Sequence, residues 1–148
     1  MGNLASLGTT VDLSYTVTPI LAWLVAGILK FIVNSLRARR LAFDLIGYGG
    51  MPSNHSAIVS SMAAAIGFKE GISHPAFGVA ITLALIVILD ASSLRKQIGK
   101  HAITLNRLAS STEGFVMLRE RVGHSRIEIC AGILVGVTVA ALVSGWLL

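Results

Sequence analysis

Charged residues and cysteine are scarce in this sequence. Only 13% of the 148 residues are Asp, Glu, Lys or Arg, whereas 54% are hydrophobic. Soluble domains carry about 25% charged residues, so this composition excludes an ordinary soluble domain and indicates an integral membrane protein. The single cysteine, Cys130, cannot form an intramolecular disulfide. The sequence has no internal repeat and no low-complexity tract, and we expect residues 1–148 to form one integral membrane domain.

Basic residues are absent from the first part of the chain, where no Lys or Arg precedes Lys30. A cleaved signal peptide begins with basic residues, so we expect the first apolar stretch to be retained as a membrane helix. Four apolar stretches are present, at about residues 15–36, 56–68, 72–89 and 127–148. The last is long enough to cross a hydrocarbon core of about 30 Å, but the second would form only about 20 Å of helix. We expect an all-α, polytopic membrane helix bundle with about four membrane helices, of which the second begins below the membrane surface.

The Lys and Arg residues that are present lie mainly in two segments, which follow the first and third apolar stretches. Ten of the twelve lie there: Arg37, Arg39 and Arg40 in one segment, and Arg95, Lys96, Lys100, Arg107, Arg119, Arg121 and Arg126 in the other. With four crossings both segments lie on one side of the membrane, and the positive-inside rule predicts that this side is cytoplasmic. A phosphate-binding site would also collect basic residues, so part of this bias can serve binding.

The second basic segment also carries a helical pattern. Leu94, Ile98, His101, Leu105 and Leu108 recur at four-three-four-three spacing, and the basic residues around them lie off this stripe. The pattern predicts a cytoplasmic amphipathic helix. Such a helix could lie on anionic lipid headgroups or lend side chains to a site, and the sequence leaves both open.

Polar side chains gather between the first two apolar stretches, in the sequence GGMPSNHSA at residues 49–57. His55 follows a Pro-Ser-Asn turn at the start of the second helix, where backbone N–H groups without helical partners favour an anion. Irregular backbone at this depth must line a protein-walled or wet cavity. We therefore expect a recessed anion site at this loop.

A second histidine opens the last helix. His124 is followed by Glu128, and a spacing of four residues places both on one helical face. The carboxylate can accept the Nδ1 proton and leave Nε2 as a nucleophile or base. Ionisable groups within or beside membrane spans are costly, by about 2.5–3.5 kcal/mol for Asp, Lys or Arg at mid-helix, and they usually serve function. The residues of this kind that map to one membrane face are Lys30, His55, Asp90, Arg95, His124 and Glu128.

Together these motifs resemble the type 2 phosphatidic acid phosphatase family. The sequence Pro-Ser-Asn-His at residues 52–55 is similar to the family's Pro-Ser-Gly-His motif, and His124-x3-Glu128-x3-Gly132 is similar to its His-x3-Asp motif with a trailing glycine. A divergent branch, the acid phosphatase/vanadium-dependent haloperoxidase-related membrane proteins, is closer still. The residues that carry the closer resemblance are Gly49 to Ser53, Asp90, Arg95, Gly99, Lys100 and Asn106.

The resemblance implies catalytic roles for three residues. The histidine of the second motif, here His55, is the general acid that protonates the leaving alkoxide. The histidine of the third motif, here His124, is the nucleophile that becomes phosphohistidine. Glu128 stands where the family has the aspartate that orients this nucleophile.

The phosphate-binding residues follow the family less closely. Lys30 and Arg37 fit the first motif, Lys-x6-Arg-Pro, although Ala38 replaces its proline. Asn54 replaces the glycine of the second motif but still offers its backbone N–H, and Ser53 can donate its hydroxyl. These residues are therefore candidates for binding the phosphate oxygens.

The arginine of the third motif is expected six residues before the nucleophile, where this chain has Leu118. Arg119 is one residue out of register. Arg95, at the end of the third apolar stretch, is the substitute that we prefer. Asp90 could hold Arg95 or Lys100 in place, and Lys100 is itself a candidate phosphate ligand.

The resemblance implies metal-independent hydrolysis of a lipid phosphate monoester, such as phosphatidic acid or phosphatidylglycerol phosphate, by one phosphatase-like membrane domain. The two basic segments, and not the resemblance, predict that this domain lies in the cell membrane with its site facing the cytoplasm, whereas other family members have sites that face outward. It implies no cofactor and no nucleic-acid partner, and the small residues of the second stretch suit a homo-oligomer as well as a monomer. One alternative is a non-enzymatic transporter or assembly subunit with an anion site. Another is a metallohydrolase with His55, His124, Asp90 and Glu128 as ligands, although the sequence has no HExxH motif.

Overall fold

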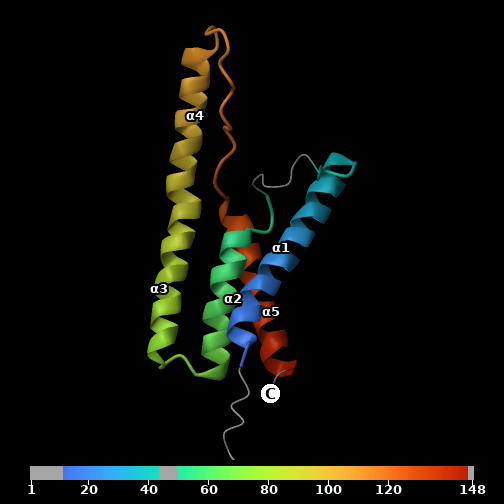
Figure 1. Cartoon of the computed structure of the whole chain (residues 1–148), viewed down its shortest axis with the longest axis vertical. Coiled ribbons are helices and arrows are strands. Elements are labelled where there is room, and N and C mark those ends of the chain that lie inside the picture. Colours follow the sequence, from blue (N-terminus) through green and yellow to red (C-terminus); the bar gives the residue numbers. More distant parts are fainter. Residues whose placement is uncertain (1–11, 44–49, 147–148) are drawn as a thin grey trace, which may run out of the picture.

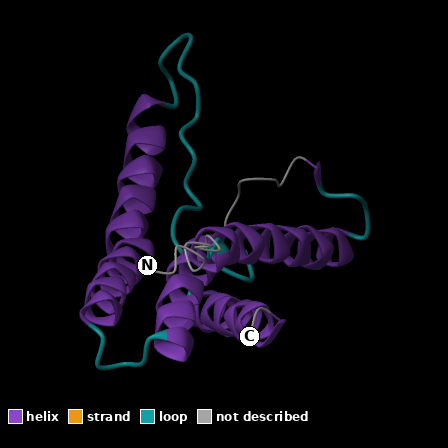
Figure 2. Cartoon of the chain, turned by 60° about the horizontal axis from the view of Figure 1, so that its bottom comes forward, coloured by secondary structure: helices purple, strands orange, loops and turns teal. Residues whose placement is uncertain are grey.

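The computed structural model describes residues 12–43 and 50–146, and within these ranges it contains helices and no strand (Figure 2). The helices in chain order are α1 (Ser14–Ala38), α2 (Asn54–Lys69), α3 (Pro75–Leu89), η2 (Asp90–Leu94), α4 (Arg95–Ala109) and α5 (Arg126–Trp146). The expected all-α fold is therefore confirmed. Gly49, the first residue of the GGMPSNHSA sequence, lies outside the described residues.

Helix α2 is the centre of the bundle and packs against α1, α3 and α5 (Figure 1). Its buried side chains are all Ser or Ala: Ser56, Ala57, Ser60, Ser61, Ala63 and Ala65. Small side chains allow neighbouring helices to approach closely, as in many membrane bundles. Many large apolar side chains point outward instead, and Ile28 of α1, Val79 of α3 and Leu134 of α5 are all more than half exposed.

Three helices are long and apolar enough to cross a membrane: Ser14–Ala38, Pro75–Ala109 and Arg126–Gly145. Helix α2 has 16 residues and is therefore about 24 Å long, shorter than the hydrocarbon core of about 30 Å. The expected count of about four membrane helices is thus not confirmed. The bundle has three candidate spans and a shorter central helix.

Helices α3 and α4 form one continuous helix of 35 residues, joined through η2. Residues 94–108 are helical as expected, but they extend α3 and do not form a separate amphipathic helix. The predicted apolar stripe, including Ile98 and Leu105, is about half exposed. The buried face of α4 consists of Gly99, Ala102 and Asn106, because small or hydrogen-bonding residues admit the returning segment that follows the helix.

Two glycines bring α5 into backbone contact with α2. A Cβ atom at Gly132 would lie 2.4 Å from the Ser53 carbonyl oxygen, and one at Gly136 would lie 2.4 Å from the Ala57 carbonyl oxygen. The Ser60 hydroxyl also donates to the Ser56 carbonyl oxygen at 2.6 Å, so it is satisfied inside this contact. The glycines therefore set the beginnings of α2 and α5 side by side.

Polar contacts close the opposite end of the bundle, where α1 begins and α2 ends. Lys69 forms an ion pair with Asp12 and donates to the Ser14 hydroxyl at 2.6 Å. The hydrogen bond from Lys69 lowers the pKa of Asp12 to about 2. The Tyr15 hydroxyl donates to the Glu70 carboxylate at 2.5 Å, so α1 is tied to α2 at this end.

The α2–α5 contact predicts the sign of two alanine substitutions. Gly132→Ala would overpack a backbone contact, which typically costs about 1–3 kcal/mol. We expect a lower melting temperature in detergent, measured by the loss of helical circular dichroism on heating.

Gly145→Ala is the matched control, because among the described residues no atom lies within 4 Å of a Cβ at this position of the same helix. Alanine favours a helix over glycine by about 1 kcal/mol, so this variant should melt at or slightly above the wild-type temperature. Equal melting temperatures for the two variants would contradict the proposed packing.

Candidate functional site

A cavity of about 630 Å³ lies between α1, the start of α2, the start of α4 and the segment before α5. Its lining has two kinds of surface. The cationic side chains are Lys30, Arg95 and Arg119, and the large apolar side chains include Trp23, Leu24, Ile28, Phe31 and Phe43. His55 and His124 also line the cavity. It can therefore receive a molecule that has an anionic group and an apolar body.

The two histidines come from helix starts that the glycine contact brings together. His55 is the second residue of α2, and His124 lies two residues before α5. Their ring centroids are 6.3 Å apart, with an angle of 53° between the ring planes. The structure thus places the two predicted catalytic histidines in one cavity.

Glu128 acts first as a helix cap. Its carboxylate accepts a hydrogen bond from the Ser125 backbone N–H at 2.8 Å, and the Ser125 hydroxyl accepts one from the Glu128 N–H at 3.3 Å. This reciprocal pair is a capping box, whose Ser-x-x-Glu signature was present in the sequence but was missed. The same carboxylate oxygen lies 3.4 Å from His124 Nδ1, a distance that is long for a hydrogen bond. Glu128 therefore fixes the start of α5 and also faces the imidazole.

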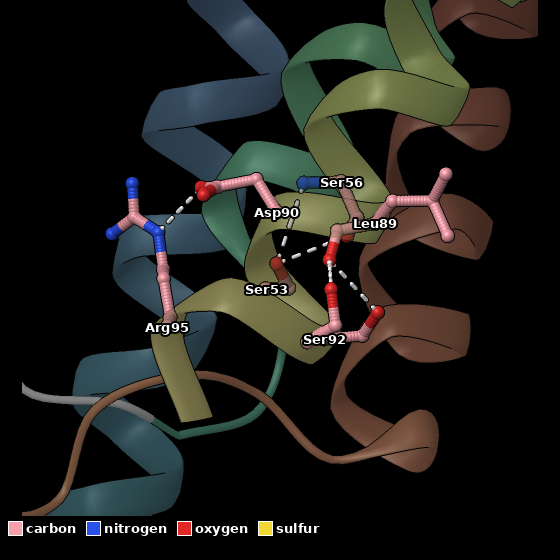
Figure 3. A network of polar contacts seen from close by, with 7 residues as sticks. Ser53, Ser56, Leu89, Asp90, Ser92 and Arg95 are labelled. Atoms are coloured by element: carbon pink, nitrogen blue, oxygen red, sulfur yellow. Dashed lines mark hydrogen bonds and ion pairs between the residues drawn. The ribbon is translucent and has the colours of Figure 1, made fainter. Parts of the chain in front are cut away.

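Ser53 is the N-cap residue of α2. Its hydroxyl oxygen accepts a hydrogen bond from the Ser56 backbone N–H at 3.3 Å (Figure 3). Its own N–H donates to the Glu128 carbonyl oxygen at 2.9 Å. Ser53 is fully buried and does not line the cavity. Its neighbour Asn54 does line the cavity. Ser53 thus links the two helix starts, while Asn54 faces the space between them.

The π-helical turn η2 orients Arg95. In an α-helix, side chains three or four residues apart share a face, but the wider π turn brings residues five apart together. The Arg95 Nε donates to the Asp90 carboxylate at 2.8 Å (Figure 3). The Ser92 and Ser93 hydroxyls donate to the Leu89 carbonyl oxygen at 3.2 Å and 2.7 Å, and such bonds disturb a regular helix. Asp90 therefore holds Arg95, as the sequence suggested.

The same π turn also holds the segment before α5. The Arg95 N–H donates to the Asp90 carbonyl oxygen in place of Ala91. The Ala91 carbonyl oxygen instead accepts from the His124 N–H at 3.0 Å. Gly123 has a φ of +92°, a conformation that favours glycine. A Cβ at this position would also lie 3.1 Å from the Lys96 backbone nitrogen. One irregular turn therefore positions both Arg95 and His124.

The remaining candidates divide into two groups. Lys30 is partly buried in the cavity wall, and Arg119 lines the cavity from the segment that returns along α4. Arg37 and Lys100 are exposed and do not line the cavity. Asn34 lines it although we did not expect it to. Its position one helical turn after Lys30 in an apolar helix was the signal that could have identified it.

Metal-binding groups are dispersed in the described part of the chain. Within residues 12–43 and 50–146, no three His, Cys, Asp or Glu side chains are grouped so that they could hold a metal ion. The four residues named for a metallohydrolase do not form such a group. His124 faces Glu128 and His55, whereas Asp90 pairs with Arg95.

The surroundings of His124 predict how its proton affinity responds to two substitutions. Burial lowers the pKa of His124 below its ordinary value of 6.5, Lys30 lowers it further, and Glu128 opposes both. Lys30→Met should therefore raise this pKa, and Glu128→Gln, which retains a capping-box residue, should lower it. Histidine NMR titration in detergent measures both shifts. Shifts of the same sign in both variants, or a wild-type pKa above 6.5, would contradict this electrostatic account.

The chain is similar to a known protein family and to a bacterial membrane protein. The Divergent PAP2 family matches residues 12–139. The "Uncharacterized membrane protein YuiD" of Bacillus subtilis (strain 168) is 29% identical over 133 residues, which cover 78% of this chain and 84% of that protein. No solved structure matches the chain. Because the family match covers most of the sequence, the chain belongs to the Divergent PAP2 family, as its motifs predicted.

Proposed function

We propose that this membrane protein hydrolyses a lipid phosphate monoester through a phosphohistidine on His124, without a metal ion. The observation that carries the proposal is the pair of histidines, 6.3 Å apart, in a cavity lined by Lys30, Arg95 and Arg119. Cations neutralise the equatorial oxygens of a transferring phosphoryl group. Membership of the Divergent PAP2 family supports the same reaction class.

The apolar part of the cavity supports a lipid as the substrate. The residues Trp23, Gly27 and Phe31 recur along one face of α1. A second hollow of about 330 Å³ continues along α1 and α2 and is lined by Pro19, Ile20, Trp23 and Ile58. A phosphate headgroup can thus lie among the cations while its hydrocarbon chain follows α1. Phosphatidic acid and phosphatidylglycerol phosphate have this chemistry.

In the first proposed step, His124 Nε2 attacks phosphorus in line while the bond from phosphorus to the lipid oxygen breaks. The protonated imidazole of His55 donates its proton to the leaving lipid alkoxide. Lys30, Arg95, Arg119 and the backbone N–H of Asn54 stabilise the negative charge on the phosphoryl oxygens. The products of this step are a lipid alcohol and phosphohistidine.

In the second step, water attacks the phosphohistidine, and the bond from phosphorus to His124 breaks. His55, now neutral, accepts the proton of the attacking water. Inorganic phosphate then leaves, and His124 is regenerated as a neutral imidazole. Burial favours this form, because burial lowers the pKa of His124.

The proposal is tested by measuring phosphate release from phosphatidic acid in detergent, with and without a chelator. Wild-type turnover should persist in the chelator. In His124→Ala it should fall by at least about 1,000-fold, because removal of a nucleophile typically has this effect. His101→Ala is the matched control, since His101 is exposed on α4, and it should retain full turnover.

Two results would contradict the proposal. Loss of turnover in the chelator with recovery in Zn²⁺ or Mg²⁺ would favour the metallohydrolase. Binding of phosphate without turnover of any lipid phosphate would favour a non-enzymatic transporter or assembly subunit with an anion site.

We also propose that the site faces the cytoplasm. Helices α1 and α4 end on one side of the molecule, and α2 and α5 end on the other (Figure 1). Both basic segments therefore belong to the side onto which the histidines open, whereas Lys69 belongs to the other. The positive-inside rule assigns the basic side to the cytoplasm.

Sidedness can be measured with single cysteines in a Cys130→Ala background. Ser111 and Ser73 are both exposed and lie at opposite ends of the molecule. In intact cells, a membrane-impermeant thiol reagent should label Ser73→Cys and should not label Ser111→Cys. The reverse pattern would place the site on the outer face and would direct the search for substrates to outer-leaflet lipids.

A further inference from the structure

Asn106 is the most unusual polar residue of α4, because its side chain is buried in a helix that is otherwise largely exposed. Only 3% of the residue is exposed. Its side-chain Nδ2 donates to the Leu118 carbonyl oxygen and to the Glu120 carboxylate, both at 2.8 Å. Its Oδ1 accepts from the Leu118 N–H at 2.7 Å. The amide thus binds both backbone groups of one residue and the side chain of another.

These contacts hold the segment that returns along α4 towards α5 (Figure 1). A second contact holds it one step further on, where a Cβ at Gly99 would lie 2.6 Å from the Glu120 carbonyl oxygen. Residues 118 and 120 are therefore both fixed against α4. The residue between them, Arg119, lines the cavity.

The geometry explains why the intervening side chain faces the cavity. The Glu120 carboxylate turns towards Asn106 on α4, whereas the side chain of its neighbour Arg119 lines the cavity. If the returning segment shifted by one residue along α4, Arg119 would point away from the cavity.

We propose that Asn106 is a positioning residue for Arg119, and that Arg119 held in this way binds the phosphate group of the ligand. The inference rests on the proposed function for the identity of that ligand. It also assigns Arg119 to the phosphate-binding place that Leu118 leaves empty in the third motif. Arg95 lies in the same cavity but is held separately by Asp90.

The test uses inorganic phosphate as the probe and the full-length protein in detergent. A ligand that binds only the folded state stabilises it by RT ln(1 + L/Kd), where L is the free ligand concentration, so the rise of the melting temperature with phosphate concentration gives the dissociation constant without turnover. We expect Asn106→Ala to weaken phosphate binding by about tenfold, because the charged hydrogen bond from Arg119 to phosphate is weakened and not abolished. Thr104→Ala is the matched control, since its exposed hydroxyl donates to the Lys100 carbonyl oxygen of the same helix, and it should bind as the wild type does.

A double-mutant cycle separates positioning from a general loss of structure. If Asn106 acts through Arg119, the double variant Asn106→Ala with Arg119→Ala should bind phosphate as weakly as Arg119→Ala alone. Asn106→Ala combined with Arg95→Ala should instead show the product of the two single effects, because Arg95 is held by other residues. If Asn106 only supported the structure in general, both double variants, with Arg119→Ala and with Arg95→Ala, would show the product of the single effects.

Three results would overturn the inference: wild-type phosphate binding by Asn106→Ala, multiplication of its effect with that of Arg119→Ala, or no phosphate binding by the wild type. The proposed function can fail separately. If the cycle behaves as expected but the wild type releases no phosphate from lipids, Asn106 still positions Arg119 in an anion site. If lipid phosphatase activity depends on His124 while the cycle shows no coupling, only the role of Asn106 is lost.

Discussion

The backbone contact between α2 and α5 is the constraint on which the rest of this structure depends. Gly132 and Gly136 leave no room for a side chain against the carbonyl groups of Ser53 and Ala57. Both helices therefore begin at the same depth, and each carries a histidine at its start. Any pair of residues large enough to separate the helices would also separate His55 from His124. Packing and site geometry are thus decided by the same few atoms.

The π turn between α3 and α4 adds the second constraint. The Ala91 carbonyl oxygen accepts a hydrogen bond from the His124 N–H, and the Asp90 carboxylate accepts one from the Arg95 side chain. A regular α-helix would satisfy the Ala91 carbonyl internally and would turn Arg95 away from Asp90. The π turn therefore positions two residues that line the cavity, His124 and Arg95. This is consistent with the frequent occurrence of π turns at functional sites.

Local patterns in the sequence predicted the helical class, the membrane character and the meeting of His55 with His124. They did not predict that α3 continues into α4, because Asp90 and two serines interrupt the apolar run and the turn is completed by the distant His124 N–H. The capping box of Ser125 and Glu128 was visible but was interpreted only as support for the imidazole. The contacts of Asn106 join residues 12 and 14 positions apart, and no local periodicity reports such pairs. The sequence alone therefore did not show that Asn106 fixes the segment from which Arg119 enters the cavity.

The helix formed by α3 and α4 is about 52 Å long for its 35 residues, and a hydrocarbon core is only about 30 Å thick. About 20 Å of it must lie outside the hydrocarbon core, among headgroups and in water, and this part carries the basic residues of α4. Charges in water are screened over about 8 Å at physiological ionic strength, whereas charges in a cavity beside the hydrocarbon are screened much less. The positive charges of the protein thus lie in two environments, the exposed part of α4 and the cavity. Salt will weaken the long-range attraction of anions to the projecting helix far more than it weakens the binding of an anion in the cavity.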